Sequence, residues 1–234
     1  TDLERLRHSC AHVMATAVLR IWPQAQFAYG PPVESGFYYD LDLDHRITPD
    51  DFEKIEAEMR KVAKENQRFE KRVVSRDEAI ALARSGRLGG LTERPGNESR
   101  FKLDLIDKIP EGEEISLYQN GEFLDLCAGP HVNYTSKCKN VKLMSVAAAF
   151  YMGDESKGQL QRLYGTAFES KEALEEHLLQ LEEAKKRDHR KLGTQLDLFH
   201  FDECAPGSVF WHSKGWTLFQ QLIAYMRQRQ FDAG

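Results

Sequence analysis

The 234-residue chain is 41% hydrophobic and 29% charged, values typical of a globular protein whose core needs no disulfides. Its net charge of −5 argues against a protein that binds nucleic acid over its whole surface, although a local basic cluster could still do so. No apolar run approaches the roughly 18 residues of a membrane span, and residues 1–12 lack the layout of a signal peptide. We therefore expect a cytoplasmic protein without a membrane role.

The chain contains four cysteines, Cys10, Cys127, Cys138 and Cys204, too few for its length to indicate a disulfide framework. In a reducing compartment, thiol or metal chemistry is favoured over disulfide bridges. The simplest alternative for each is a small buried hydrophobic side chain, which we favour for Cys10 and Cys204.

The first part of the chain is predicted to contain two helices around a hairpin. Apolar residues recur at helical spacing over residues 2–22 and stop at Pro23, which predicts an amphipathic helix. Residues 27–33 and 37–43 have strand composition, and the Ser35-Gly36 turn between them predicts a hairpin. Thr48, followed by proline and two acidic residues, predicts the start of a helix that runs to about residue 66.

The middle of the chain is dominated by predicted strands. A strand is predicted over residues 69–74, a short helix capped by Ser75 runs to residue 84, and residues 85–99 are predicted as a loop. Further strands are predicted over residues 101–106, 115–119, 122–126 and 141–146. Because strands and helices do not alternate as βαβ units, we predict an α+β fold with an antiparallel sheet and packed helices.

The last part of the chain changes character at Ser170, where a cap begins a long charged helix that is predicted to reach about residue 192. Its length and polarity suit a connector. Aromatic residues then concentrate, and an apolar helical pattern follows, which indicates the beginning of another domain. We therefore predict a first domain over residues 1–168, a connector helix over residues 169–194 and a further domain over residues 195–234.

The predicted connector carries a basic cluster made of Lys185, Lys186, Arg187 and Arg190. Nucleic-acid binding and an ordinary solvated helix face both explain such a cluster, and the sequence leaves both open. A smaller basic group lies at Lys137, Lys139 and Lys142.

Two motifs contain residues suited to a metal or a catalytic site. His8 and His12 lie one turn apart on the first predicted helix and project from one face, although helices also carry such pairs by chance. In Cys127-Ala-Gly-Pro-His131, the glycine-proline pair predicts a turn that brings the thiol and the imidazole together. Three histidines and one cysteine suit tetrahedral zinc, with a metal-free polar pocket as the alternative.

Ser9 distinguishes this motif from that of zinc peptidases, which carry a glutamate general base directly after the first histidine. The groups left to activate water are the histidines and Asp125, which lies two residues before Cys127. Lys102 is a candidate for binding an anion or a developing negative charge, with an exposed strand lysine as the alternative.

Four segments together resemble the editing domain of bacterial threonyl-tRNA synthetases, which is shared in outline with alanyl-tRNA synthetase. They are His8-Ser-Cys-Ala-His12, Gly36-Phe-Tyr-Tyr-Asp40, Leu124-Asp-Leu-Cys-Ala-Gly-Pro-His131 and Leu160-Gln-Arg-Leu-Tyr-Gly-Thr-Ala167. Two more resemble the linker helix and the opening of the class II catalytic domain, namely Arg187-Asp-His-Arg-Lys191 and Phe210-Trp-His-Ser-Lys-Gly-Trp216.

The resemblance implies a domain that hydrolyses mischarged seryl-tRNA(Thr) to serine and free tRNA. By position it implies a catalytic pocket of His8, His12, Lys102, Asp125, Cys127 and His131. Gly30 and Tyr39 would line this pocket, and Lys185, Lys186, Arg187 and Arg190 would contact tRNA. Zinc bound by His8, His12, Cys127 and His131 is a secondary expectation, because threonyl-type editing sites can work without a tightly held metal.

The resemblance also implies that the full-length enzyme attaches threonine to tRNA(Thr) with ATP and forms a homodimer. Residues 195–234 resemble only the opening of its catalytic domain, so we expect no ligase activity from this chain. A non-catalytic tRNA-binding or assembly module, and a metal-dependent hydrolase of small esters or amides, are the alternative functions.

Overall fold

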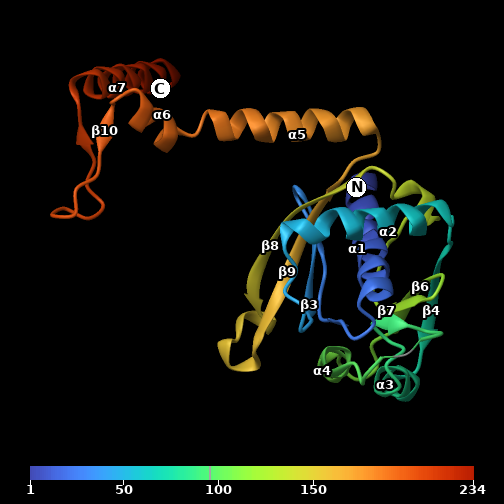
Figure 1. Ribbon diagram of the computed structural model, residues 1–234. Coiled ribbons are helices and arrows are strands. Elements are labelled where there is room, and N and C mark those ends of the chain that lie inside the picture. Colours follow the sequence, from blue (N-terminus) through green and yellow to red (C-terminus); the bar gives the residue numbers. More distant parts are fainter. Residues whose placement is uncertain (95) are drawn as a thin grey trace. The chain divides into compact units, whose positions relative to one another are not determined.

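The computed structural model describes residues 1–94 and 96–234 (Figure 1). Its internal contacts divide the chain into two units, Thr1–Leu174 and Glu175–Gly234. Pro95, in the loop predicted over residues 85–99, lies outside the described residues.

Helix α1 (Asp2–Ile21) is the central element of the first unit. A capping box begins it, because the Thr1 hydroxyl accepts a hydrogen bond from the Glu4 N–H while the Glu4 side chain bonds back to the N-terminus. Every residue from Ser9 to Leu19 is buried. The helix is present where it was predicted, but it is covered on all sides rather than on one face.

One antiparallel sheet lies against α1 and has the strand order β1-β3-β9-β8, with β2 also paired to β3. Its strands are β1 (Gln26–Phe27), β2 (Pro32–Val33), β3 (Gly36–Asp42), β8 (Val141–Phe150) and β9 (Gln159–Ala167). The predicted hairpin is present as β2 and β3. Strand β8 continues to Phe150, beyond the predicted end, and β9 was not predicted.

A second antiparallel sheet has the order β4-β6-β7-β5. Its strands are β4 (Phe69–Val74), β5 (Gly90–Leu91), β6 (Ile115–Asn120) and β7 (Phe123–Leu126). Helix α1 contacts elements of both sheets and lies between them (Figure 1). The α+β class and the antiparallel pairing are confirmed, whereas the predicted single sheet is in fact two.

Helix α2 (Phe52–Lys64) follows the short 3-10 helix η1 (Pro49–Asp51) and packs along α1. The Thr48 start agrees with the prediction. Arg20, in the last turn of α1, forms ion pairs with Glu58 of α2 and with Glu122 in the turn between β6 and β7. This arginine links the central helix to both neighbours.

Helices α3 (Arg76–Arg84) and α4 (Arg100–Lys108) pack on the second sheet through a cluster of buried side chains. The cluster consists of Ala79, Ala83, Leu88, Ile106, Ile115, Leu117 and Leu124. Helix α3 agrees with the prediction. The predicted strand over residues 101–106 is wrong, because these residues form α4, and so is the exposed strand position considered for Lys102, which is buried.

The remaining elements include three 3-10 helices, η2 (Thr135–Lys137), η3 (Tyr151–Gly153) and η4 (Glu155–Lys157). Helix α5 (Lys171–Lys186) begins in the first unit and continues into the second, which also contains α6 (His189–Gln195), β10 (Phe199–His200), β11 (Phe210–Trp211) and α7 (Ser213–Ala233). The predicted connector helix is interrupted, since Asp188 caps a separate helix by accepting a hydrogen bond from the Arg190 N–H.

Candidate functional site

His8 and His12 enter the site from the middle of α1, one turn apart. The His12 ring is 2% exposed, and its Nδ1 atom has no hydrogen-bond partner among the described residues. His8 is less buried and contacts the His12 ring edge-on, with ring centroids 5.5 Å apart. The helix therefore presents two imidazoles to the same space.

The partner segment leaves β7 and turns back toward α1. Asp125 is the third residue of β7, and Cys127 directly follows the strand. Gly129 has φ +73°, and an added Cβ would lie 2.5 Å from the Tyr118 hydroxyl oxygen, so this turn requires glycine. The turn carries Cys127 and His131 to the two α1 histidines.

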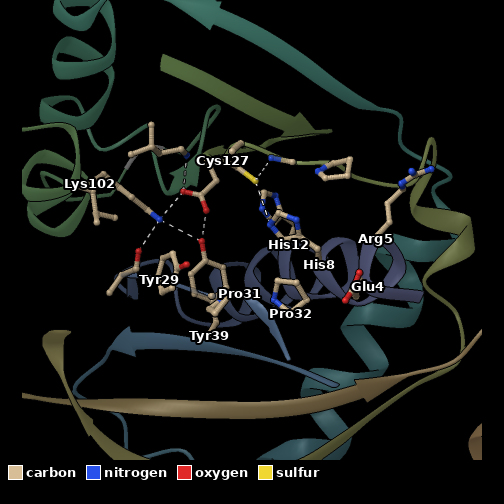
Figure 2. Close-up of a pocket in the computed structure, with 18 of the residues that line it drawn as sticks. Glu4, Arg5, His8, His12, Tyr29, Pro31, Pro32, Tyr39, Lys102 and Cys127 are labelled. Atoms are coloured by element: carbon tan, nitrogen blue, oxygen red, sulfur yellow. Dashed lines mark hydrogen bonds and ion pairs between the residues drawn. The ribbon is translucent and has the colours of Figure 1, made fainter. Parts of the chain in front are cut away.

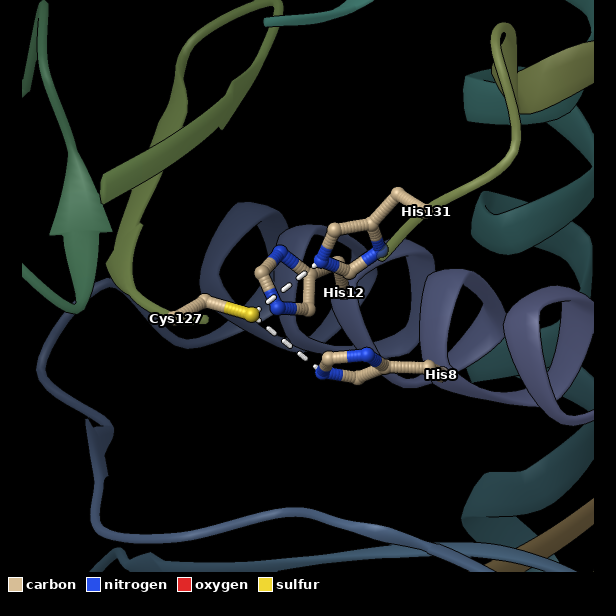
Figure 3. Close-up of side chains that lie close together, drawn as sticks. All are labelled: His8, His12, Cys127 and His131. Carbon is tan, nitrogen blue, oxygen red and sulfur yellow. Dashed lines mark hydrogen bonds between the residues drawn. The ribbon is translucent and has the colours of Figure 1, made fainter. Parts of the chain in front are cut away.

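The Cys127 sulfur points toward the three imidazoles from one side (Figure 3). Its Sγ is 3.3 Å from His8 Nε2 and 3.2 Å from His131 Nε2. The Gly129 N–H also donates a hydrogen bond to this sulfur. One ligand atom from each of His8, His12, Cys127 and His131 lies within 4.8 Å of the others, so the four predicted metal ligands are brought together.

Two aromatic rings hold His131. Phe69 stacks on it with ring centroids 4.8 Å apart and an interplanar angle of 3°, and Tyr118 contacts it at 4.5 Å. The ring is 8% exposed, so its position is set by packing rather than by solvent.

Lys102 and Asp125 form a buried ion pair beside the imidazole cluster (Figure 2). Lys102 Nζ is 2.8 Å from Asp125 Oδ1, and it donates a hydrogen bond to the Ala28 carbonyl. The Tyr39 hydroxyl donates to the other carboxylate oxygen of Asp125, and the Leu126 N–H donates to Oδ1. Each carboxylate oxygen is therefore occupied, and the lysine charge is compensated.

The two groups share one cavity with a volume of about 470 Å³. This volume fits a ligand larger than a single amino acid. His8, His12, Gly30, Tyr39, Lys102, Asp125 and Cys127 all line it, together with Glu4, Arg5, Tyr29, Pro31 and Pro32 among others. His131, in contrast, is not part of the cavity lining and lies behind the sulfur.

Burial makes the cluster electrically neutral near pH 7. Desolvation lowers the pKa of His12 and His131 well below the ordinary value, and the neighbouring imidazoles lower both further. Burial likewise lowers the pKa of His8. It raises the pKa of the Cys127 thiol to about 12. The site thus offers neutral imidazoles, of which His12 and His131 are weak bases, and a thiol that retains its proton.

These pKa shifts predict that the chelator-treated chain loses stability as the pH falls below about 6.5, the ordinary pKa of histidine. Below this pH, His12 and His131 are protonated in the unfolded chain but stay neutral in the folded chain. Each of these histidines therefore lowers the free energy of unfolding by about 1.4 kcal/mol per pH unit. Urea unfolding at pH 7.5 and 5.5 measures the effect. An equal free energy of unfolding at both values would contradict it.

Comparison with known proteins shows which sequences the chain is similar to. Residues 115–164 match the family described as the threonyl and alanyl tRNA synthetase second additional domain. Over 232 residues, 99% of the chain, the sequence is 50% identical to the threonine–tRNA ligases of Burkholderia vietnamiensis (strain G4 / LMG 22486) and Paraburkholderia xenovorans (strain LB400). The corresponding enzyme of Methylibium petroleiphilum (strain ATCC BAA-1232 / LMG 22953 / PM1) is 49% identical. Almost the whole chain is therefore similar to part of these threonine–tRNA ligases.

The chain spans 35% of the length of these synthetases. The residues matched to the second additional domain run from β6 into β9 and include Asp125, Cys127 and His131. The α1 histidines and Lys102 lie outside this match, although they form the same site. Among the described residues, no helix has both the length and the hydropathy needed to cross a bilayer.

The basic cluster predicted to contact tRNA lies in the second unit. Lys186 and Arg187 both pair with Glu183, at 2.8 Å and 3.4 Å, and Arg190 pairs with Asp188 at 2.7 Å. Adjacent carboxylates therefore compensate part of its charge. Among the remaining cysteines, Cys10 is buried as expected, whereas Cys204 is exposed, so that expectation was wrong.

Several residues of the candidate site were not predicted from the sequence. Ser9 and Phe69 surround His131, and Arg5 and Tyr29 line the cavity. Ser9 was considered only because it stands where zinc peptidases carry a glutamate, and its contact with His131 was not predicted. The others belong to no motif, because their role comes from elements that meet through the fold.

Proposed function

We propose that this site hydrolyses the ester bond of seryl-tRNA(Thr) and releases serine and free tRNA. The convergence of neutral imidazoles with a buried Lys102–Asp125 pair, in one cavity of a synthetase-type domain, is the observation that supports this most strongly. Such an activity is needed because a pocket for threonine rejects serine, smaller by one methyl group, by only about 1–3 kcal/mol.

His8 is the favoured group to deprotonate the attacking water, and His12 is favoured to orient it. Both line the cavity and are neutral near pH 7, but the pKa of His8 is lowered less than that of His12, so His8 is the better general base. Asp125 is less suited, since both of its oxygens are engaged, and His131 lies outside the cavity lining. The water oxygen bonds to the seryl carbonyl carbon, the bond to the ribose oxygen breaks, and that oxygen takes a proton.

Lys102 and Tyr39 are proposed to bind the tRNA terminus. Lys102 Nζ is 3.3 Å from the Tyr39 hydroxyl, so a cation and a hydroxyl face the cavity together. A nearby Gly30 keeps the wall open, since an added Cβ would come within 2.5 Å of the Tyr39 ring. The three N–H donors of Lys102 already reach Asp125, Ala28 and Tyr39, so a ribose hydroxyl or phosphate oxygen would accept a hydrogen bond from Lys102 by displacing one of these acceptors.

The four-residue cluster has a donor set that fits zinc. It offers three imidazole nitrogens and one sulfur, and the buried His12 Nδ1 has no partner among the described residues. His8, His12, Cys127 and His131 would hold the ion. A bound zinc would polarise the ester carbonyl or lower the pKa of a bound water.

For the longer protein, we propose that it joins threonine to tRNA(Thr) with ATP, acts as a homodimer and resides in the cytoplasm. Lys185, Lys186, Arg187 and Arg190 are proposed to contact the tRNA backbone, which carries the complementary charge.

The test compares seryl-tRNA(Thr), threonyl-tRNA(Thr) and serine ethyl ester as substrates of the chelator-treated chain, with and without added zinc. We expect serine release from seryl-tRNA(Thr), much slower release of threonine, and little turnover of the free ester. Protection of seryl-tRNA without release would instead indicate a binding module. Zinc-dependent turnover of the free ester at a comparable rate would indicate a general hydrolase.

A further inference from the structure

Ser9, a residue outside the cavity lining, connects α1 to the back of His131. Its side chain is completely buried, and its Oγ has three polar neighbours. The Arg5 carbonyl oxygen lies at 2.8 Å, the Val132 nitrogen at 2.9 Å and His131 Nδ1 at 3.1 Å. All three distances are those of hydrogen bonds.

The chemistry of these neighbours fixes where the protons lie. The Arg5 carbonyl can only accept, so the single hydroxyl proton of Ser9 must point to it; otherwise two oxygens would face each other at 2.8 Å without a hydrogen between them. The Val132 N–H can only donate, and it uses one lone pair of Oγ. The remaining contact requires a proton on His131 Nδ1.

This arrangement determines what His131 presents to the sulfur. A neutral imidazole carries one proton, so a proton on Nδ1 leaves a lone pair on Nε2. That lone pair points to Cys127 Sγ at 3.2 Å, while stacking on Phe69 opposes rotation of the ring out of its plane. The outer hydrogen bond of an imidazole commonly fixes its tautomer in this way.

We propose that Ser9 is a positioning residue that locks His131 in the Nδ1–H tautomer, so that Nε2 accepts the proton of the Cys127 thiol and orients its sulfur toward the cavity. The same tautomer would serve a metal ligand. The structural part of this proposal stands by itself, whereas its effect on catalysis rests on the proposed deacylation.

The first experiment reads the tautomer directly and needs no activity. The chelator-treated chain, labelled with ¹⁵N-histidine, is studied at about pH 8 by long-range ¹H–¹⁵N correlation, with His131 assigned through His131→Asn. We expect a protonated Nδ1 and an unprotonated Nε2 at His131, and a loss of this pattern in Ser9→Ala. A protonated Nε2 in the unmodified chain overturns the proposal, even if Ser9→Ala fails to fold.

A matched control tests whether any lost buried hydroxyl has the same effect. Thr16 lies on the same helix, is also fully buried, and donates a hydrogen bond to the carbonyl four residues earlier at 2.8 Å. Thr16→Val should leave the His131 tautomer unchanged. A tautomer that changes equally in Thr16→Val, or that is unchanged in Ser9→Ala, contradicts a specific role of Ser9.

The second experiment measures deacylation. Ser9→Ala should lower kcat about 10- to 100-fold, the usual effect of losing such an outer partner, with little change in KM because Ser9 does not line the cavity. In a His131→Ala background it should have almost no further effect. An equal loss in both backgrounds would show that Ser9 does not act through His131. If no variant and no unmodified chain deacylates seryl-tRNA, the proposed function fails while the tautomer result stands.

Discussion

Replacing Lys102 by methionine is expected to destabilise the first unit by about 3–5 kcal/mol and to abolish deacylation. The substitution leaves the buried Asp125 carboxylate, 1% exposed, without its cation, and among the described residues the Tyr39 hydroxyl and the Leu126 N–H are its remaining hydrogen-bond donors. An unpaired buried charge is far more costly than the pair itself. Urea unfolding and serine release from seryl-tRNA(Thr) measure the two effects.

Helix α4 supplies the control for this experiment. Lys108 pairs with Asp104 one turn apart at 2.6 Å, but both side chains are about 40% exposed. Lys108→Met should therefore cost at most about 1 kcal/mol and leave deacylation intact. If the two variants lose similar stability, the Lys102–Asp125 pair is not the buried element that the structure indicates. Adding Asp125→Leu to Lys102→Met should recover part of the lost stability without restoring activity.

Alanine at His12 is the second large expected effect, with a fall in deacylation rate of about 10²–10⁴. His12 lines the cavity with a neutral, buried imidazole, so the substitution removes a group proposed to orient the water and one of the four potential metal ligands. Cys127→Ala should cause a comparable loss, because the sulfur contacts both His8 and His131. Single-turnover hydrolysis of seryl-tRNA(Thr) measures both rates.

His45 provides the matched histidine control for these two substitutions. Its imidazole lies in the same unit, is about 43% exposed and stacks on Trp22 away from the cavity. His45→Ala should hydrolyse seryl-tRNA(Thr) at the unchanged rate. Full activity in both His12→Ala and Cys127→Ala would disprove the proposed chemistry of the cluster.

Local signals in the sequence predicted several elements well. Strand β4 and helix α3 have the predicted bounds, since Ser75 forms its expected cap with the Glu78 N–H. Such caps depend on residues a few positions apart, so the sequence contains all the information they need. The interruption between α5 and α6 was missed because Asp188 was counted within a charged helix rather than as a cap.

The strand predicted over residues 101–106, where the structure has α4, was wrong for a physical reason. Residues 101–105 alternate apolar and polar side chains, a pattern typical of a half-buried strand. Lys102, the second residue of this stretch, occupies a buried position of the helix where an apolar residue would be expected. It is buried there because its charge pairs with Asp125. The charged site residue Lys102, at a core position, therefore obscured the helical pattern of the segment that contains it.

The same limit applies to the site. Sequence motifs proposed His8, His12, Cys127 and His131 as one group, and the structure brings them together. The hydrogen bonds of Ser9 and the stacking of Phe69 join segments far apart in the chain, and no local pattern encodes such contacts. The proton positions follow only when all neighbours of an atom are known.

The contact between His8 and Cys127 joins residues 119 positions apart and has a consequence for biosynthesis. At about 5–20 residues per second, the ribosome reaches Cys127 roughly 6–24 s after it has added His8. During that interval α1 has neither the β7 turn nor β9 to cover it. Until translation has passed these segments, a nascent chain cannot assemble the cavity, whatever the state of its N-terminal helix.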